Sequence, residues 1–146
     1  MTTTAAPAKP VPVRDEASGP FFDGALQGRL MLLRCAACNT HMSPVAYLGV
    51  PLRPRCVGCF SGDLHWAASG GRATLHSFAI MHQLYDEAFA AEIPYNIAVV
   101  ETEEGVRLTS QVVDCPNERL EIGMALDVTF ERMSDEVAVP KFRPRS

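Results

Sequence analysis

The stretch "LLRCAACNTHMSPVAYLGVPLRPRCVGCF" (residues 32–60) holds four of the five cysteines of this 146-residue chain. They form two Cys-x-x-Cys pairs, Cys35/Cys38 and Cys56/Cys59, with 17 residues between the pairs. This spacing is typical of zinc ribbons, in which each pair makes a tight turn that directs two thiolates at one ion. The sequence therefore predicts a four-cysteine zinc site.

The predicted zinc is structural rather than catalytic. Four cysteines fill a tetrahedral shell, whereas a catalytic zinc keeps one position open for water. His41 and His65 lie nearby in sequence and are interpreted as ordinary polar residues. Iron in a rubredoxin-like site is the alternative, and such sites often have glycine after the second cysteine of a pair. Asn39 can adopt the left-handed backbone conformation that this position needs, whereas Phe60 is expected to do so poorly, which argues against iron.

Arginines surround the cysteines, and two interpretations of them stay open. A shell of four thiolates around Zn²⁺ has a formal charge of −2, which Arg34, Arg53 and Arg55 would offset. Together with Arg29, the same side chains could instead bind the phosphates of coenzyme A.

Charge is unevenly distributed along the chain. Residues 1–71 contain six Lys/Arg and four Asp/Glu, a formal charge of +2, and residues 72–146 contain seven Lys/Arg and thirteen Asp/Glu, a formal charge of −6. Because phosphate contacts supply most of the affinity for nucleic acid, the acidic second half argues against that ligand. No apolar run approaches the roughly 20 residues of a membrane helix, and the N-terminus lacks a signal-peptide centre. We expect a cytoplasmic protein, in which paired cysteines favour a metal over disulfides.

Residues 18–28 are predicted to form a short helix with Ser18 as its N-cap. Phe21, Phe22 and Leu26 fall on one face of this helix. Such a face either covers the chain's own core or docks a partner.

The second half has the period-two alternation of half-buried antiparallel strands, as in residues 106–112 and 126–130. Residues 72–82 are also strand-like, but Leu75 and Phe78 fall on opposite faces unless a bulge intervenes. A last strand around Pro140 is predicted at a sheet edge, because proline lacks the N–H that a central strand needs. A small closed barrel is the economical way to hide the edges of about five strands.

Other chemically active residues form no recognisable motif. Cys115 is interpreted as an inert small residue. His76 and His82 could share one face of a strand, but no acid accompanies them, so a surface role is favoured. Glu104 is interpreted, together with its neighbour, as solvated loop charge. No phosphate-binding, nucleophile-elbow or metalloprotease motif is present, and we expect no self-sufficient catalytic apparatus.

Several motifs, taken in order, resemble a known family. They are "FFDGALQGRLMLLRC" (21–35), "CAAC" and "CVGC", "SGGRATLHSF" (69–78), "PYNIAVVETEEGVRLTSQVV" (94–113) and "IGMALDVTFE" (122–131). Together they resemble the zinc-ribbon plus OB-fold proteins associated with acyl-CoA enzymes, labelled "domain of unknown function 35". Phe60 departs from the family pattern, because many relatives have a small residue there.

The Thr-, Ala- and Pro-rich composition of residues 1–17 predicts a disordered tail. The resemblance implies a mainly β protein, with an N-terminal helix and rubredoxin-like zinc ribbon over 18–71 and a five-stranded OB barrel over 72–146. The alternative for the tail is a strap that becomes ordered against a partner.

The resemblance also implies a function. Such proteins are non-catalytic accessory subunits of thiolase-like enzymes (condensing enzymes, acyltransferases or aldolases) in acyl-CoA and lipid metabolism. They form hetero-oligomers in which they stabilise the partner and help to form the acyl-CoA site. The alternatives are a stand-alone acyl-CoA-binding module and a nucleic-acid-binding OB protein.

Overall fold

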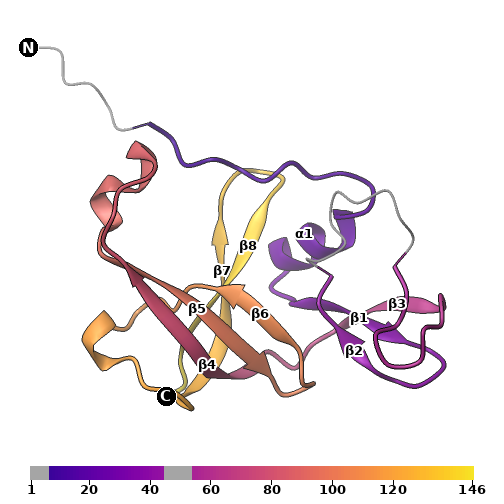
Figure 1. Ribbon diagram of the computed structural model, residues 1–146. Helices are drawn as coiled ribbons and strands as arrows, with labels where there is room; N and C mark the ends of the chain where they lie inside the picture. Colours follow the sequence, from indigo (N-terminus) through magenta and orange to yellow (C-terminus); the bar gives the residue numbers. More distant parts are fainter. Residues whose placement is uncertain (1–6, 45–53) are drawn as a thin grey trace, which may run out of the picture.

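The computed structural model describes residues 7–44 and 54–146, which form two antiparallel sheets and one α-helix (Figure 1). The ribbon sheet has the order β2 (His41–Met42), β1 (Met31–Cys35), β3 (Leu64–Ala68). The barrel sheet has the order β6 (Arg107–Ser110), β5 (Tyr95–Thr102), β4 (Arg72–Met81), β7 (Ala125–Arg132), β8 (Ala138–Pro144). Short 3-10 helices, η2 (Glu87–Glu92) and η3 (Asn117–Arg119), follow β4 and β6 along the chain. The predicted mainly β fold is confirmed.

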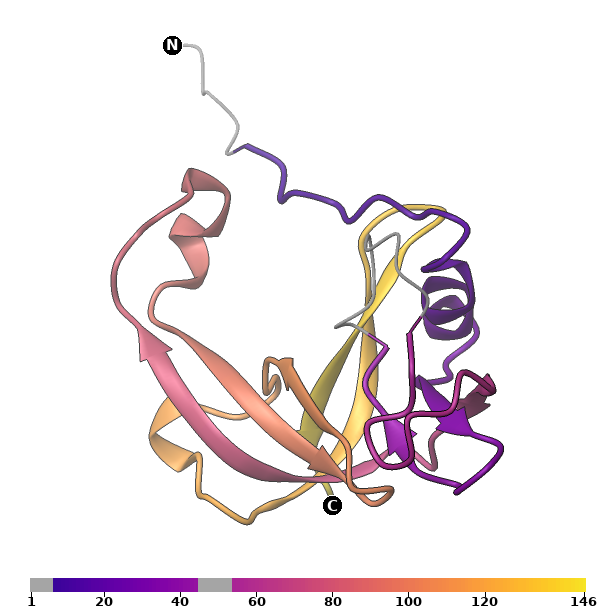
Figure 2. The same cartoon turned by 45° about the vertical axis from the view of Figure 1, so that its right-hand side comes forward.

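The barrel sheet curves strongly from β6 to β8 (Figure 2). The register of β4 against β5 shifts between Leu75 and Ser77, which is the bulge that the broken alternation predicts. The predicted edge strand is also confirmed, because β8 ends the sheet. Strand β8 lies beside the end of β6. The Ser110 hydroxyl of β6 donates a 2.9 Å hydrogen bond to the Pro140 carbonyl of β8, and Val112, just after β6, forms a parallel bridge with Phe142 of β8.

Helix α1 (Gly19–Leu26) seals the barrel core. Phe21 and Phe22 are buried, their rings packed edge-to-face at 5.4 Å, and both belong to the same apolar cluster as Leu75 and Phe142 of the barrel. Ser18 occupies the predicted N-cap position but makes no side-chain cap; its hydroxyl instead accepts a 2.9 Å hydrogen bond from the Asp15 N–H. The aromatic face thus covers the chain's own core, and partner binding through Phe21, Phe22 and Leu26 stays a prediction.

The chain passes from the ribbon sheet to the barrel sheet at Gly70 and Gly71, between β3 and β4. Gly71 has a φ of +85°, and a Cβ added there would lie 2.9 Å from Cγ1 of Val128. The Val128 N–H also donates a 2.8 Å hydrogen bond to the Gly71 carbonyl. Only glycine satisfies both the positive φ and this close approach without displacing a neighbour.

Residues 7–17, here called the N-terminal strap, run along one end of the barrel from η2 to α1 (Figures 1 and 2). Lys9 is ion-paired with Glu92 at the η2 end, and Arg14 with Asp23 of α1. Disorder is predicted for residues 1–17; residues 1–6 lie outside the described part of the chain. Within that described part, no helix is long and apolar enough to cross a membrane.

Candidate metal centre

The four cysteines of the two pairs converge on one point. Their sulfur atoms all lie within 4.8 Å of one another, with 3.6 Å between Cys35 and Cys59 and 3.5 Å between Cys38 and Cys56. Tetrahedral Zn–S bonds of about 2.3 Å require S–S separations of about 3.8 Å. The cluster is therefore able to hold a metal ion with little rearrangement, and thiolates are ligands that favour soft or borderline ions.

Two knuckles with matching geometry carry these sulfurs. Asn39 donates its backbone N–H to the Cys35 carbonyl and Phe60 donates its own to the Cys56 carbonyl, both at 2.9 Å. Asn39 has a φ of 63° and Phe60 a φ of 67°, so both have left-handed backbone conformations. Phe60 therefore adopts the left-handed conformation even though its side chain disfavours it. The identity of this residue consequently does not distinguish zinc from iron.

Two arginines stabilise the same knuckles. Arg34 donates a 2.7 Å hydrogen bond to the Asn39 side chain, and Arg55 donates a 3.3 Å hydrogen bond to the Phe60 carbonyl. The Arg55 guanidinium also lies 5.6 Å from the centre of the Phe60 ring, a cation–π arrangement. Arg29 is exposed beyond α1, and Arg53 lies outside the described residues. Binding of coenzyme A phosphates by these arginines stays a prediction.

The sulfurs compete for protons because they are so close together. The hydroxyl of Thr40 at 3.0 Å lowers the pKa of the Cys38 thiol to about 6, and the backbone N–H of Cys59 lowers the pKa of Cys56. At Cys59 the backbone N–H of Ser61 lowers the pKa, but the neighbouring sulfurs of Cys35 and Cys38 outweigh it and raise the pKa to about 12. A divalent cation would replace the shared protons and hold all four groups as thiolates.

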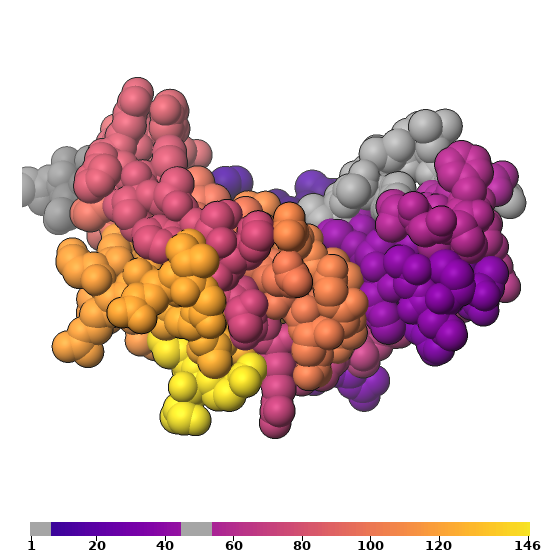
Figure 3. Space-filling view, turned by 60° about the horizontal axis from the view of Figure 1, so that its bottom comes forward, coloured from indigo at the N-terminus to yellow at the C-terminus, as the bar shows by residue number. Residues whose placement is uncertain are grey.

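The apolar core beneath the centre is small. It consists of Leu33, Cys35, Met42 and Cys56, with Leu64 and Trp66 partly buried against them. Trp66 also packs against the barrel core, so it links the two clusters. The ribbon lies at one end of the molecule and η2 at the other (Figure 3). A core of this size stabilises a fold weakly, so a metal ion bound by the four cysteines would contribute an important part of the ribbon's folding energy.

The histidines and the fifth cysteine that the sequence analysis considered do not belong to the four-cysteine cluster. The cysteines alone form a metal-ligand group among the described residues. His65 lies 2.7 Å from the Asp63 carboxylate, and the Cys115 thiol contacts the Pro116 carbonyl at 3.5 Å. His76 falls in the β4 bulge and His82 follows the end of β4, and both are exposed.

Comparison with known proteins gives relatives along almost the whole chain. The family described as the C-terminal OB-fold domain of ChsH2 matches residues 66–131. A probable enoyl-CoA hydratase alpha subunit of Thermomonospora curvata is 33% identical over 136 residues, which are 93% of this chain and 40% of that protein. A DUF35 domain-containing scaffold protein of Methanocaldococcus jannaschii is 30% identical over 108 residues, which are 73% of this chain and 71% of that protein.

A solved structure is similar over the same extent. A chain of the Ltp2–ChsH2(DUF35) aldolase superposes with a TM-score of 0.73 at 32% identity, covering 91% of this chain and 98% of that one. By contrast, this chain spans less than half of the Thermomonospora curvata relative. The similarity is therefore to one part of that hydratase subunit and to nearly all of the aldolase chain.

Proposed function

This chain belongs to the DUF35 family, and on that premise we propose that it is a non-catalytic accessory subunit of a thiolase-like enzyme in acyl-CoA metabolism. In this role the partner supplies the nucleophile and the acid and base groups. The present chain stabilises the partner and helps to form the site that receives the acyl-CoA.

One observation carries the proposal: the similarity to a chain of the Ltp2–ChsH2(DUF35) aldolase, whose name joins a DUF35 protein to a second component. The name of the Methanocaldococcus relative, a scaffold protein, supports a role in assembly rather than in chemistry. The name of the Thermomonospora relative supports a link to acyl-CoA substrates. Fold alone does not fix function, so the assignment depends on these similarities and not on the barrel itself.

The metal in this proposal is a structural zinc ion, held by Cys35, Cys38, Cys56 and Cys59. Support comes from the convergence of the four sulfurs and from the lowered pKa of Cys38 and Cys56. When bound, zinc would neutralise the thiolates and join the two knuckles. Elemental analysis of the purified chain tests this point: one zinc ion per chain and a colourless solution are expected, and a red protein with bound iron would contradict it.

The partner is tested by co-expression with thiolase-like proteins from the same organism, each produced with and without this chain. We expect one of them to become soluble and fully active only in the presence of this chain. A partner that is soluble and equally active alone would contradict the proposal. Calorimetry with acyl-CoA distinguishes an accessory subunit from a stand-alone acyl-CoA-binding module. Heat of binding to the isolated chain would favour the stand-alone module.

A further inference from the structure

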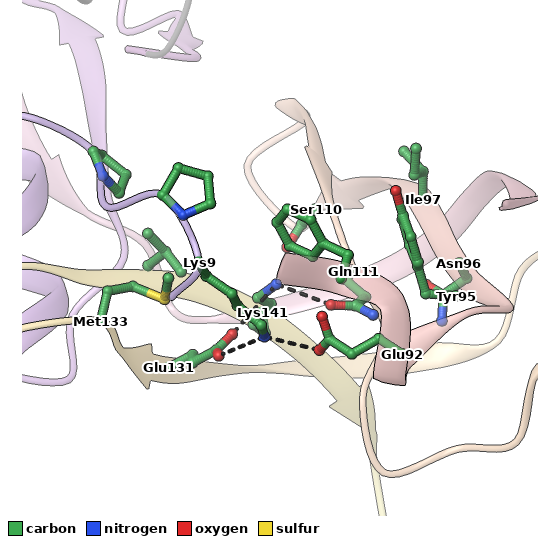
Figure 4. A pocket seen from close by; sticks show the side chains of 14 residues that line it. Lys9, Glu92, Tyr95, Asn96, Ile97, Ser110, Gln111, Glu131, Met133 and Lys141 are labelled. Atoms are coloured by element: carbon green, nitrogen blue, oxygen red, sulfur yellow. Dashed lines mark hydrogen bonds and ion pairs between the residues drawn. The ribbon is translucent and has the colours of Figure 1, made fainter. Parts of the chain in front are cut away.

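A groove of about 370 Å³ lies between the N-terminal strap, η2 and strands β5, β6, β7 and β8 (Figure 4). Its η2 end is at the opposite end of the molecule from the ribbon (Figure 3). Its walls are mainly apolar and include two rings, Phe89 and Tyr95, whose centres are 6.1 Å apart. The strap contributes Lys9, Pro10 and Pro12 to the lining.

Lys9 enters the groove between two carboxylates, as Figure 4 shows. Its Nζ lies 2.8 Å from Oε1 of Glu92 and 3.3 Å from Oε1 of Glu131, and 5.8 Å from the centre of the Phe89 ring. Two anionic acceptors and an aromatic face form a site that suits an ammonium group. Lys141 also contacts Glu131, at 3.5 Å, but a single lysine cannot balance both carboxylates, so the groove without Lys9 has a net negative charge.

The strap is held by side chains alone. Among the described residues, no backbone–backbone hydrogen bond joins residues 7–14 to the rest of the chain. Lys9, Pro10 and Pro12 line the groove, whereas Val11 and Val13 do not line it and are 42% and 87% exposed. Because little of the strap is buried, a competing segment needs to replace few contacts.

We propose that this groove is a peptide-binding site for an extended segment of another protein that carries a lysine next to prolines, and that Lys9, with Pro10 and Pro12 at the groove wall, holds its two carboxylates as a tethered competitor. The chemistry of the occupant follows from the strap itself: an ammonium group for Glu92 and Glu131, and proline rings for the apolar wall. Proline suits such a groove because the groove offers no backbone pairing and a pre-extended segment loses little entropy on binding. The inference is independent of the proposed function, since it concerns a different surface and needs no thiolase-like partner.

The test uses a fluorescently labelled peptide, "PAKPVP", with the sequence of residues 7–12. Its binding is measured by anisotropy to the full-length chain and to its Lys9→Glu variant, in which the carboxylates repel the strap. A short tether gives a local concentration in the millimolar range, so we expect the variant to bind the peptide at least about 10-fold more tightly than the unchanged chain does. A peptide with glutamate in place of lysine should not bind either protein.

Two further variants keep the test specific. Arg119→Glu makes the same charge reversal at an exposed site on η3, outside the groove lining, and should leave peptide binding at the level of the unchanged chain. Adding Glu92→Gln to the Lys9→Glu variant removes one ammonium acceptor and should weaken binding about 5-fold or more. Equal binding to the unchanged chain and the Lys9→Glu variant, no binding to that variant at millimolar peptide, or indifference to the peptide's lysine would each overturn the proposal.

Discussion

The hydroxyl of Ser69 donates a 2.6 Å hydrogen bond to Oε1 of Glu104, across 35 positions of sequence. The N–H of Gly70 donates to the other oxygen of the same carboxylate at 3.0 Å. Ser69 follows the last ribbon strand and Glu104 lies in the turn between β5 and β6. The Glu104 carboxylate therefore links the segment that leaves the ribbon sheet to the β5–β6 turn of the barrel sheet. The interpretation of Glu104 as solvated loop charge is wrong.

Replacing Glu104 by alanine should lower the free energy of unfolding by about 2 kcal/mol, because hydrogen bonds to a charged acceptor contribute more than neutral ones. Urea unfolding followed by tryptophan fluorescence measures this change, since Trp66 packs against both cores. Glu118→Ala, at an exposed position on η3, is the matched control and should change stability by less than about 0.5 kcal/mol. Equal stabilities of the two variants would refute the role given to Glu104.

The contribution of Glu104 should also depend on pH. Partial burial raises the pKa of Glu104, but the hydrogen bonds from Ser69 and Gly70 outweigh it and hold the pKa below the ordinary value of 4.5. A carboxylate whose pKa is lower in the folded state adds stability above pH 4.5 and loses that contribution as the pH falls through the folded value. The stability difference between the unchanged chain and Glu104→Gln should be constant from pH 7 to pH 5.5 and shrink below pH 4.5. A difference that grows on acidification would contradict this.

Much of the fold can be predicted because its signals are local. Alternation along residues 106–112 and 126–130 marks the barrel strands, and the interruption after Leu75 marks the bulge. The spacing of the cysteine pairs predicts a cluster that the structure brings together within 4.8 Å. Each of these signals is contained in a few neighbouring residues, where periodicity and turn chemistry dominate.

Other features could not be predicted because they join distant positions. Lys9 pairs with Glu92 and Glu131, which are 83 and 122 residues away, and composition alone makes this segment look disordered. Phe60 has a backbone conformation that its side chain disfavours, because the second knuckle has to match the first. Here the tertiary requirement of the cluster outweighs the local preference.

Phe60→Asn tests that conflict directly. Asparagine tolerates the left-handed region better than phenylalanine, as Asn39 illustrates in the first knuckle, whereas the substitution loses the stacking of Arg55 on the ring. Relief of backbone strain of about 1 kcal/mol should exceed the loss of an exposed cation–π contact of about 0.5 kcal/mol. We expect unchanged metal content and an equal or higher unfolding midpoint. A marked loss of stability would show that the ring, which is 74% exposed, contributes more than its contacts indicate.

Serine substitution distinguishes the cluster from the fifth cysteine. Cys56→Ser should reduce the metal content well below one ion per chain and lower the unfolding midpoint, because one of four ligands is lost from a small core. Cys115→Ser should leave the metal content unchanged, since Cys115 lies outside the cluster, and should lower the unfolding midpoint less than Cys56→Ser does, because its side chain is only partly buried against the barrel core. Elemental analysis and thermal unfolding report both. Full metal retention by Cys56→Ser would exclude the four-cysteine site.

The central claim is that this chain is a structural subunit of a larger enzyme, and the molar mass of a co-expressed pair tests it most directly. Light scattering coupled to size-exclusion chromatography should give one peak that contains both proteins, whose mass exceeds that of the thiolase-like partner assembly by a whole multiple of 15.9 kDa. Two separate peaks for every thiolase-like protein of the organism, with each of those enzymes fully active alone, would contradict the account.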